Sequence, residues 1–198
     1  PEKLTSDARG ELRRQLADSK LTVASLMENV SPLADEKTHL AILDRLKRAC
    51  GLANDLSPLS PPLIETVLGG KPAEWEQVRD TMVTRLQDWA KIAEAEKTVI
   101  ALKPNVSGAL NTPKEAVWLM ERLKTPWLRL AYDYSHFELQ KIPFQESLQT
   151  MLPQTSFIHV KDTEGTAAKF QFLLPGDGRT DYATYFQKLK AAGYRGPL

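Results

Sequence analysis

Apolar and polar residues alternate along the chain in two different periods that follow one another from end to end. Apolar residues at three- and four-residue intervals, typical of one face of an α-helix, predict helices over 7–20, 35–55, 73–96, from 113 onward, 143–152 and 181–192. Short runs rich in β-branched and aromatic residues predict strands over 21–28, 62–68, 98–104, 127–133 and 156–162, with a further short one over 169–174. This strand–helix alternation predicts parallel strands joined by helical crossovers.

Several residues mark where these elements begin and end. Thr112, Pro113 and Glu115 have the spacing of an N-cap, a proline at the first helical position and a capping box. Gly69-Gly70 follows the strand over 62–68, and Gly193 follows the last helix. The predicted helix and strand boundaries are therefore supported by capping and turn residues.

The order of the elements favours a closed barrel over an open sheet. An open doubly wound sheet usually has a glycine-rich phosphate loop after its first strand, and this sequence has none. The chain begins with a helix and ends in "YRGPL", which resembles the beginning of another strand. With one strand restored at each end, the count approaches the eight of a (β/α)8 TIM barrel. We expect residues 1–198 to form a single α/β barrel domain whose first and last strands lie outside this chain.

Composition excludes several functional classes. The 198 residues are 42% hydrophobic and 26% charged, with a net charge of +1, which is typical of a soluble globular domain and not of a nucleic-acid-binding protein. No apolar run approaches the roughly 20 residues of a membrane span. Cys50 is expected in the core, and His39 on the surface. A cytoplasmic location is the default expectation, although a signal peptide before Pro1 would not be seen in this sequence. Assembly into a homo-oligomer stays open.

The polar residues at the strand ends share one orientation. Side chains alternate across a strand, so the positions of the apolar residues in each strand define which neighbours point into the barrel. This parity places Lys103, Asp133, His159 and Lys161 on the inward face, and Glu65 can also point inward. Active sites of TIM barrels are built at the carboxyl ends of several strands. The sequence therefore predicts an active site from these residues.

Three motifs carry a resemblance to a known family. The segments "YDYSH", "IHVKD" and "LPGDGRTDY", the last followed by "FQKLKAAGYRGPL", resemble the sugar phosphate isomerase/epimerase family with its xylose isomerase-like TIM barrel, of which endonuclease IV is a distant relative. The resemblance implies one divalent cation (Mn, Co, Zn or Mg), with Asp133 and His159 matching metal ligands. It also implies that His136 hydrogen-bonds the substrate.

Lys103 departs from the family pattern, because it stands where many relatives have a metal-binding glutamate. A cation about 4 Å from the metal would be repelled by on the order of 4 kcal/mol at an effective dielectric constant of 20. Two alternatives stay open. Either Asp133, His159 and a glutamate expected on the last strand, outside this chain, still hold a metal beside a neutral Lys103, or the Lys103 ammonium replaces the metal and stabilises an oxyanion.

The reaction that the resemblance implies is proton abstraction next to the carbonyl of a small-molecule sugar or sugar phosphate, giving an enediolate. Isomerisation or epimerisation follows when the proton returns. Lys103, Glu65 and His136 are the candidate catalytic residues, with Glu65 as the base. Lys161, Arg179 and Glu28, together with His136, are candidate substrate-binding residues, and Asp162 is expected to orient loop backbone.

Two other functions stay open from the sequence. One is a hydrolase or lyase that acts on an oxidised sugar through the same enolisation. The other is a non-catalytic carbohydrate-binding barrel in which Lys103 marks a lost metal site. A nuclease is the least favoured, because three histidines and a net charge of +1 provide neither the ligands nor the basic surface.

Overall fold

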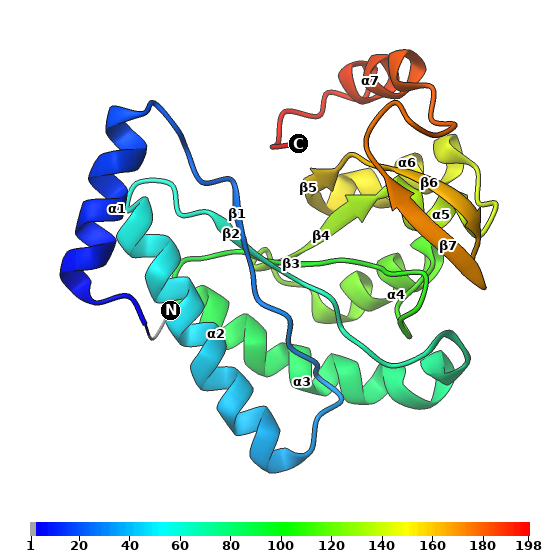
Figure 1. Ribbon diagram of the computed structural model, residues 1–198. Helices are drawn as coiled ribbons and strands as arrows, with labels where there is room; N and C mark the ends of the chain where they lie inside the picture. The colour runs from blue at the N-terminus through cyan, green and yellow to red at the C-terminus, as the bar shows by residue number, and fades with distance from the viewer. Residues whose placement is uncertain (1–2) are drawn as a thin grey trace.

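A sheet of five parallel strands forms the centre of the computed structural model, in which residues 3–198 are described. Its strands are β1 (Ser25–Met27), β2 (Leu63–Thr66), β3 (Ile100–Leu102), β4 (Leu128–Asp133) and β5 (Thr155–His159). Each strand pairs in parallel with the next one along the chain, so the order in the sheet is the order in the sequence. This is the strand order of a TIM barrel, and the sheet forms an open part of one (Figure 1).

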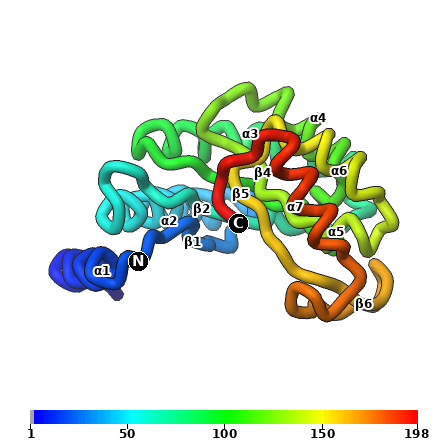
Figure 2. The backbone as a smooth tube through the Cα atoms, turned by 90° about the horizontal axis from the view of Figure 1, so that it is seen from above, coloured from blue at the N-terminus to red at the C-terminus, as the bar shows by residue number. Residues whose placement is uncertain are grey.

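The helices are α1 (Ser6–Asp18), α2 (Glu36–Leu56), α3 (Trp75–Ala95), α4 (Pro113–Leu123), α5 (Tyr134–Glu138), α6 (Phe144–Met151) and α7 (Tyr182–Ala191), with short 3-10 turns η1 (Pro72–Glu74) and η2 (Leu152–Gln154). Most of the helices lie on one face of the sheet, whereas α1 precedes β1 and packs against α2 (Figure 2). Within residues 3–198, no helix has the length and apolar character that a membrane crossing requires.

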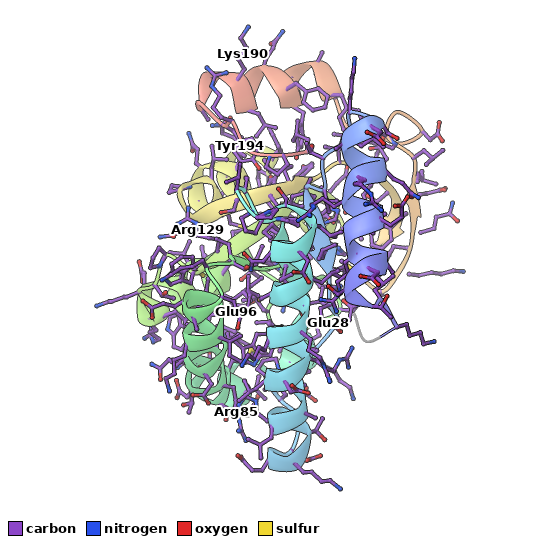
Figure 3. The ribbon with its side chains drawn as sticks, turned by 90° about the vertical axis from the view of Figure 1, so that its left-hand side faces the viewer. Glu28, Arg85, Glu96, Arg129, Lys190 and Tyr194 are labelled. Carbon is purple, nitrogen blue, oxygen red and sulfur yellow. The ribbon has the colours of Figure 1, made fainter. Side chains whose placement is uncertain are left out.

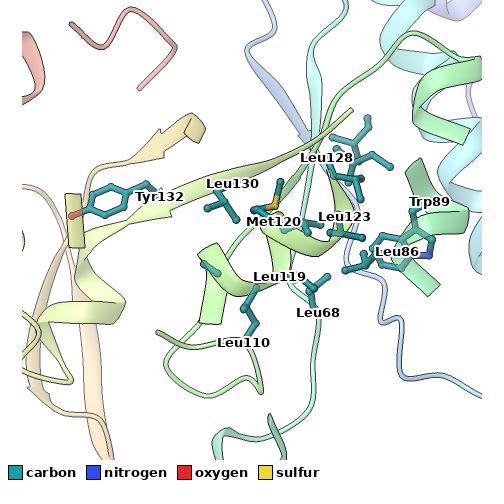
Figure 4. Packing of buried hydrophobic residues seen from close by; sticks show 14 of the residues in the cluster. Leu68, Leu86, Trp89, Leu110, Leu119, Met120, Leu123, Leu128, Leu130 and Tyr132 are labelled. Carbon is teal, nitrogen blue, oxygen red and sulfur yellow. The ribbon is translucent and has the colours of Figure 1, made fainter. Parts of the chain in front are cut away.

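The main hydrophobic core lies between the helices and the outer face of the sheet. Leu128, Leu130 and Tyr132 alternate along β4 and are fully buried in this core. Leu86 and Trp89 of α3 are part of it as well (Figure 4). Burial of these apolar side chains is the main force that holds the helices to the sheet. The predicted outward face of β4 is confirmed.

The predicted capping residues occupy their expected places. The Thr112 side chain accepts a hydrogen bond from the Glu115 backbone N–H. The Glu115 side chain accepts one from the Thr112 backbone N–H, which completes the capping box at the start of α4. Gly69 and Gly70 have φ angles of +76° and +72°, which residues other than glycine rarely adopt. A Cβ atom on Gly70 would also lie 2.8 Å from the Cβ of Ala109.

Two predictions about the strands need correction. The segment predicted as one strand over 156–162 is divided, because β5 ends at His159 and a new strand, β6 (Asp162–Thr166), begins at Asp162. The short strand over 169–174 is β7 (Lys169–Leu173), which pairs antiparallel with β6 in a separate two-stranded sheet. Period-two alternation is the same in a hairpin and in a barrel strand, so the sequence did not distinguish them.

Three further expectations concern Cys50, His39 and the end of the chain. Cys50 is fully buried, as predicted. The surface position expected for His39 is wrong, because this side chain is 1% exposed and its Nε2 lies 3.4 Å from Asp88 Oδ2 of α3. His39 lies three residues before Ile42 and seven before Leu46, on the same buried face of α2. At the end of the chain, the carbonyl of Pro197 accepts a hydrogen bond from Ile158 N–H, so the segment "GPL" lies beside β5.

Candidate active site

Two layers of side chains cover the inner face of the sheet near the carboxyl ends of its strands. The lower layer is a small apolar cluster of Leu63, Ala101, Ala131 and Phe157. Because side chains two positions apart on a strand share a face, the next inward residues form a second layer. We call this second layer the polar layer; it consists of Glu65, Lys103, Asp133 and His159. The inward orientation predicted for all four is confirmed by this cluster and by the contacts described below.

The first half of the site is the glutamate group, which we define as Glu65, Lys103 and His159. Glu65 is 1% exposed at the carboxyl end of β2. Its Oε2 atom lies 2.6 Å from His159 Nε2 of β5, and its Oε1 atom lies 2.8 Å from Lys103 Nζ beyond β3. The lysine contact has the distance of an ion pair without hydrogen-bond alignment. Lys103 Nζ is also 3.5 Å from His159 Nε2.

These contacts fix the charge of Glu65. Burial alone would raise the pKa of its carboxyl group, since a charged form is poorly solvated inside a protein. The contacts with His159 and Lys103 act in the opposite direction and prevail, so the pKa of Glu65 is lowered and the group is a carboxylate. Its strongest contact, at 2.6 Å, makes His159 Nε2 the hydrogen-bond donor and leaves the lone pair of a neutral ring on Nδ1.

The second half is the aspartate group, which we define as Asp133, His136 and Lys161. Asp133 ends β4 and is fully buried. Its Oδ2 atom lies 3.0 Å from Lys161 Nζ and 3.5 Å from His136 Nε2, while its Oδ1 atom accepts a hydrogen bond of 2.5 Å from Ser135 Oγ. Burial would raise the pKa of Asp133, but the nearby His136, Lys161 and Ser135 lower it, so this group is ionised as well.

His136 is a neutral side chain in this arrangement. Its Nδ1 atom accepts a hydrogen bond from the backbone N–H of Val106, at 3.3 Å, so the proton of the ring is on Nε2 and faces Asp133. Burial lowers the pKa of His136 to about 4, although the Asp133 carboxylate acts to raise it. Its Nε2 atom also lies 3.4 Å from Lys161 Nζ, so His136 packs against both members of the Asp133–Lys161 ion pair.

Chemically, the site combines the carboxylate-bound imidazole of His159 with the ammonium groups of Lys103 and Lys161, all of them at least partly buried. The His159 side chain is 28% exposed, whereas Glu65 behind it is 2% exposed. The Lys161 side chain is 23% exposed. His159 and Lys161 are therefore the members that a bound molecule can reach most easily, and the two carboxylates form the buried support beneath them.

Two predicted substrate-binding residues have partners elsewhere. Glu28 follows β1 (Figure 3) and forms an ion pair with Arg45 of α2. Arg179, with a side chain that is 66% exposed, has its Nε atom 3.8 Å from Glu138 Oε1. Neither contact joins the polar layer, so the structure brings together Lys103, Glu65, His136, Asp133, His159 and Lys161 but not these two.

The donor set does not fit a divalent metal ion as it is arranged. Asp133 and His159 are direct partners in the pairing of β4 with β5, as a shared metal would need. Each side chain has another partner, however, because His159 binds Glu65 and Asp133 binds Lys161. Within residues 3–198, no three His, Cys, Asp or Glu side chains are grouped as metal ligands. An ammonium group stands within 3.0 Å of each carboxylate, where a cation would have to bind.

Two residues of the site were missed by the sequence reasoning. Ser135 holds Asp133 in place. Only its position between Asp133 and His136 in "DYSH" could have pointed to it. Phe172 of the β6–β7 hairpin has its ring against Lys161 and His136. The alternation of Phe170 and Phe172 in "KFQFLL" marked an apolar strand face but gave no sign that this face meets the barrel.

The chain matches a known protein family over its whole length. The family model described as a xylose isomerase-like TIM barrel matches residues 1–198. L-ribulose-5-phosphate 3-epimerase UlaE of Salmonella paratyphi C is 26% identical over 134 residues, which are 66% of this chain and 46% of that protein. Inosose dehydratase of Geobacillus thermodenitrificans is 26% identical over 141 residues, 64% of this chain and 47% of that protein. The chain thus spans about half the length of these curated relatives.

Solved structures show the same fold. A xylose isomerase domain protein from Planctomyces limnophilus has a TM-score of 0.82 at 17% identity. The matched region is 100% of this chain and 77% of that protein's chain. The IOLI protein with a bound zinc atom has a TM-score of 0.80 at 20% identity. The matched region is 100% of this chain and 73% of that protein's chain. At this level of identity, these structures establish the shared fold.

Proposed function

Because the chain belongs to the family of xylose isomerase-like TIM barrels, we propose that its protein is an isomerase or epimerase of a small sugar or sugar phosphate. In this proposal the enzyme removes a proton next to a carbonyl group and forms an enediolate. Returning the proton to the neighbouring carbon gives isomerisation, and returning it to the other face of the same carbon gives epimerisation. The relatives that are epimerases support this class of reaction.

The observation that carries the proposal is the glutamate group. Enolisation needs a base for the proton and a positive group for the negative charge that develops on the carbonyl oxygen. His159 and Lys103 provide both within 3.5 Å of each other, at the end of the barrel where active sites of this fold are built. No step of this mechanism uses a metal.

We assign the proton transfer to His159 and a positioning role to Glu65. The sequence favoured Glu65 as the base, but both of its oxygens face His159 and Lys103. A carboxylate that accepts the Nε2 proton of an imidazole orients the ring and stabilises the imidazolium that forms when Nδ1 takes up a proton. Lys103, which touches the same carboxylate, stabilises the enediolate oxygen.

Lys161 is the residue that we assign to substrate binding. Its ammonium is partly exposed beside the aspartate group and can contact a hydroxyl, carbonyl or phosphate oxygen. UlaE is named for L-ribulose 5-phosphate, which makes this compound the first substrate to test.

A second candidate function is elimination of water, which the inosose dehydratase among the relatives favours. The first step is the same proton removal. The enolate then expels a hydroxyl group from the next carbon, and that oxygen leaves as water after it is protonated. The same residues would serve both reactions, so the products must distinguish them.

Proton exchange in D2O tests both candidates in one experiment. The protein is incubated with L-ribulose 5-phosphate, inosose and a panel of ketoses, and proton NMR follows the signal of the carbon-bound hydrogen next to the carbonyl. Deuterium in a new sugar supports the isomerase or epimerase, and loss of water supports the lyase. Binding without exchange overturns both and supports a non-catalytic sugar-binding protein.

Lys103 is the first residue to vary in this assay. We expect Lys103→Met to slow exchange by about 100- to 1,000-fold, the usual effect of losing one group that stabilises an oxyanion. Lys190→Met is the matched control, because Lys190 is an exposed lysine on α7 (Figure 3) that is not a member of the glutamate group. Equal rates in the two variants would contradict the role of Lys103.

A further inference from the structure

The β6–β7 hairpin brings an aromatic side chain against the site. In the hairpin register, Thr163 of β6 lies opposite Phe172 of β7. The Lys161 Nζ atom lies 3.6 Å from the centre of the Phe172 ring, and the His136 ring meets it edge-on at 5.2 Å. Phe172 therefore touches two of the three members of the aspartate group, from an element outside the barrel sheet.

Much of the Phe172 ring is still uncovered. The residue is 44% exposed, although it is large and apolar and adjoins the polar aspartate group. Its neighbour in ring contact, Phe170, lies on the same face of the hairpin with a centroid distance of 5.2 Å. An exposed apolar surface at the edge of a polar site is typical of a pocket that binds a small molecule with both apolar and polar faces.

The base of the hairpin is held firmly, which defines where Phe172 lies. The buried Asp162 carboxylate accepts hydrogen bonds from the backbone N–H groups of Gly176, Gly178 and Thr180, at 2.8, 3.2 and 3.1 Å. Asp162 thus orients loop backbone, as the sequence predicted. Thr163 Oγ1 also donates a hydrogen bond of 2.7 Å to Glu138 Oε2 of α5. Contacts on both sides of the first hairpin strand therefore fix its position over the site.

From this geometry we propose that Phe172 is a specificity-determining residue that packs against the C–H face of the bound sugar. The inference rests on the proposed function, since it gives the sugar its orientation in that site. Phenylalanine has no hydrogen-bonding group, so its ring favours carbon-bound hydrogens over hydroxyl groups. Lys161 beneath the ring then contacts an oxygen of the same sugar. The ring also shields the Lys161–Asp133 ion pair from water.

The kinetic test compares Phe172→Ala with Gln171→Ala in the exchange assay with L-ribulose 5-phosphate and the ketose panel. Gln171 is the adjacent residue on the opposite face, exposed and hydrogen-bonded to Glu164. We expect Phe172→Ala to raise KM at least tenfold with a smaller change in kcat, and to reduce the preference among the sugars. Phe172→Leu, which keeps an apolar side chain, should restore part of the affinity. Gln171→Ala should leave KM and kcat unchanged.

A second measurement does not depend on activity. Acetic anhydride labels accessible lysines, and mass spectrometry gives the labelling rate of Lys161. We expect this rate to rise several-fold in Phe172→Ala and to stay the same in Gln171→Ala. An unchanged rate in Phe172→Ala would show that the ring does not cover Lys161.

The outcomes separate this inference from the proposed function. Exchange by the wild-type protein with an unchanged KM in Phe172→Ala overturns the inference alone. If the wild-type protein binds L-ribulose 5-phosphate without exchange, the proposed function fails, and the dissociation constants of the two variants replace KM in the comparison. Absence of both exchange and binding with every sugar overturns both.

Discussion

The glutamate group and the aspartate group contain the same three kinds of side chain but differ in burial. Each has a carboxylate, a lysine and a histidine, and in each the ammonium lies within 3.0 Å of the carboxylate. The histidines differ most, since the side chain of His159 is 28% exposed and that of His136 is 3% exposed. His159 comes from a strand end, whereas His136 comes from the short helix α5 beneath the hairpin.

This difference shows that environment decides what a residue can do. The buried His136 ring accepts a backbone hydrogen bond at Nδ1 and is neutral, whereas the His159 ring is held at Nε2 by a carboxylate and is partly open to solvent. The sequence motif "DYSH" draws attention to His136, whereas the proposed function assigns proton transfer to His159. The predictions below test this division between the two groups.

The largest effect is expected at the two histidines. We expect His159→Gln to slow proton exchange by about 100- to 10,000-fold, the usual contribution of a general base. His136→Gln should slow it much less, because His136 acts through Asp133. The NMR exchange assay measures both, with circular dichroism as a check on folding. Equal losses in both variants would contradict the division.

The next effect concerns stability. Asp133→Asn keeps the shape of the side chain but leaves Lys161 without its carboxylate, and removing one partner of a buried ion pair costs about 3 to 5 kcal/mol. Because the Lys161 side chain is 23% exposed, the lower end of that range is expected. Urea unfolding of the variant and the wild type measures the difference. A loss below about 1 kcal/mol would mean that the aspartate group behaves like a surface pair.

Stability should also depend on pH through His136. Its pKa is about 4 in the folded protein against an ordinary value of 6.5. Between these values the unfolded chain binds a proton that the folded chain does not, so the free energy of unfolding falls as the pH is lowered from 6.5 to 4. The full difference corresponds to about 3 kcal/mol. Urea unfolding at several pH values should show it, and His136→Gln should remove this part of the dependence.

The smallest effect is expected at Glu28. Its partner Arg45 has a side chain that is 49% exposed, and pairs of this kind contribute about 0 to 1 kcal/mol. Glu28→Gln should therefore change the free energy of unfolding by less than about 1 kcal/mol and leave proton exchange unchanged. A marked loss of exchange would restore the substrate-binding role that the sequence suggested for Glu28.

Sequence reasoning reached the fold and most members of the site. Helix and strand periods identified the parallel sheet, and the parity of apolar residues placed Lys103, Asp133 and His159 on its inner face. The errors have physical reasons. His39 was misjudged because its polar ring was expected in solvent, although its spacing from Ile42 and Leu46 places it on the buried face of α2. The hairpin was misjudged because a strand's period does not specify its neighbour.

By itself, the sequence determined which side chains share a layer, because the two-residue period of a strand is a local property of the backbone. Only the tertiary structure decided which of them pair. His159 is in register with Asp133 yet binds Glu65, 94 residues earlier in the chain. Phe172 reaches the aspartate group from a separate hairpin. Such contacts depend on the curvature of the sheet and on the packing of elements distant in sequence, and no spacing along the chain encodes them.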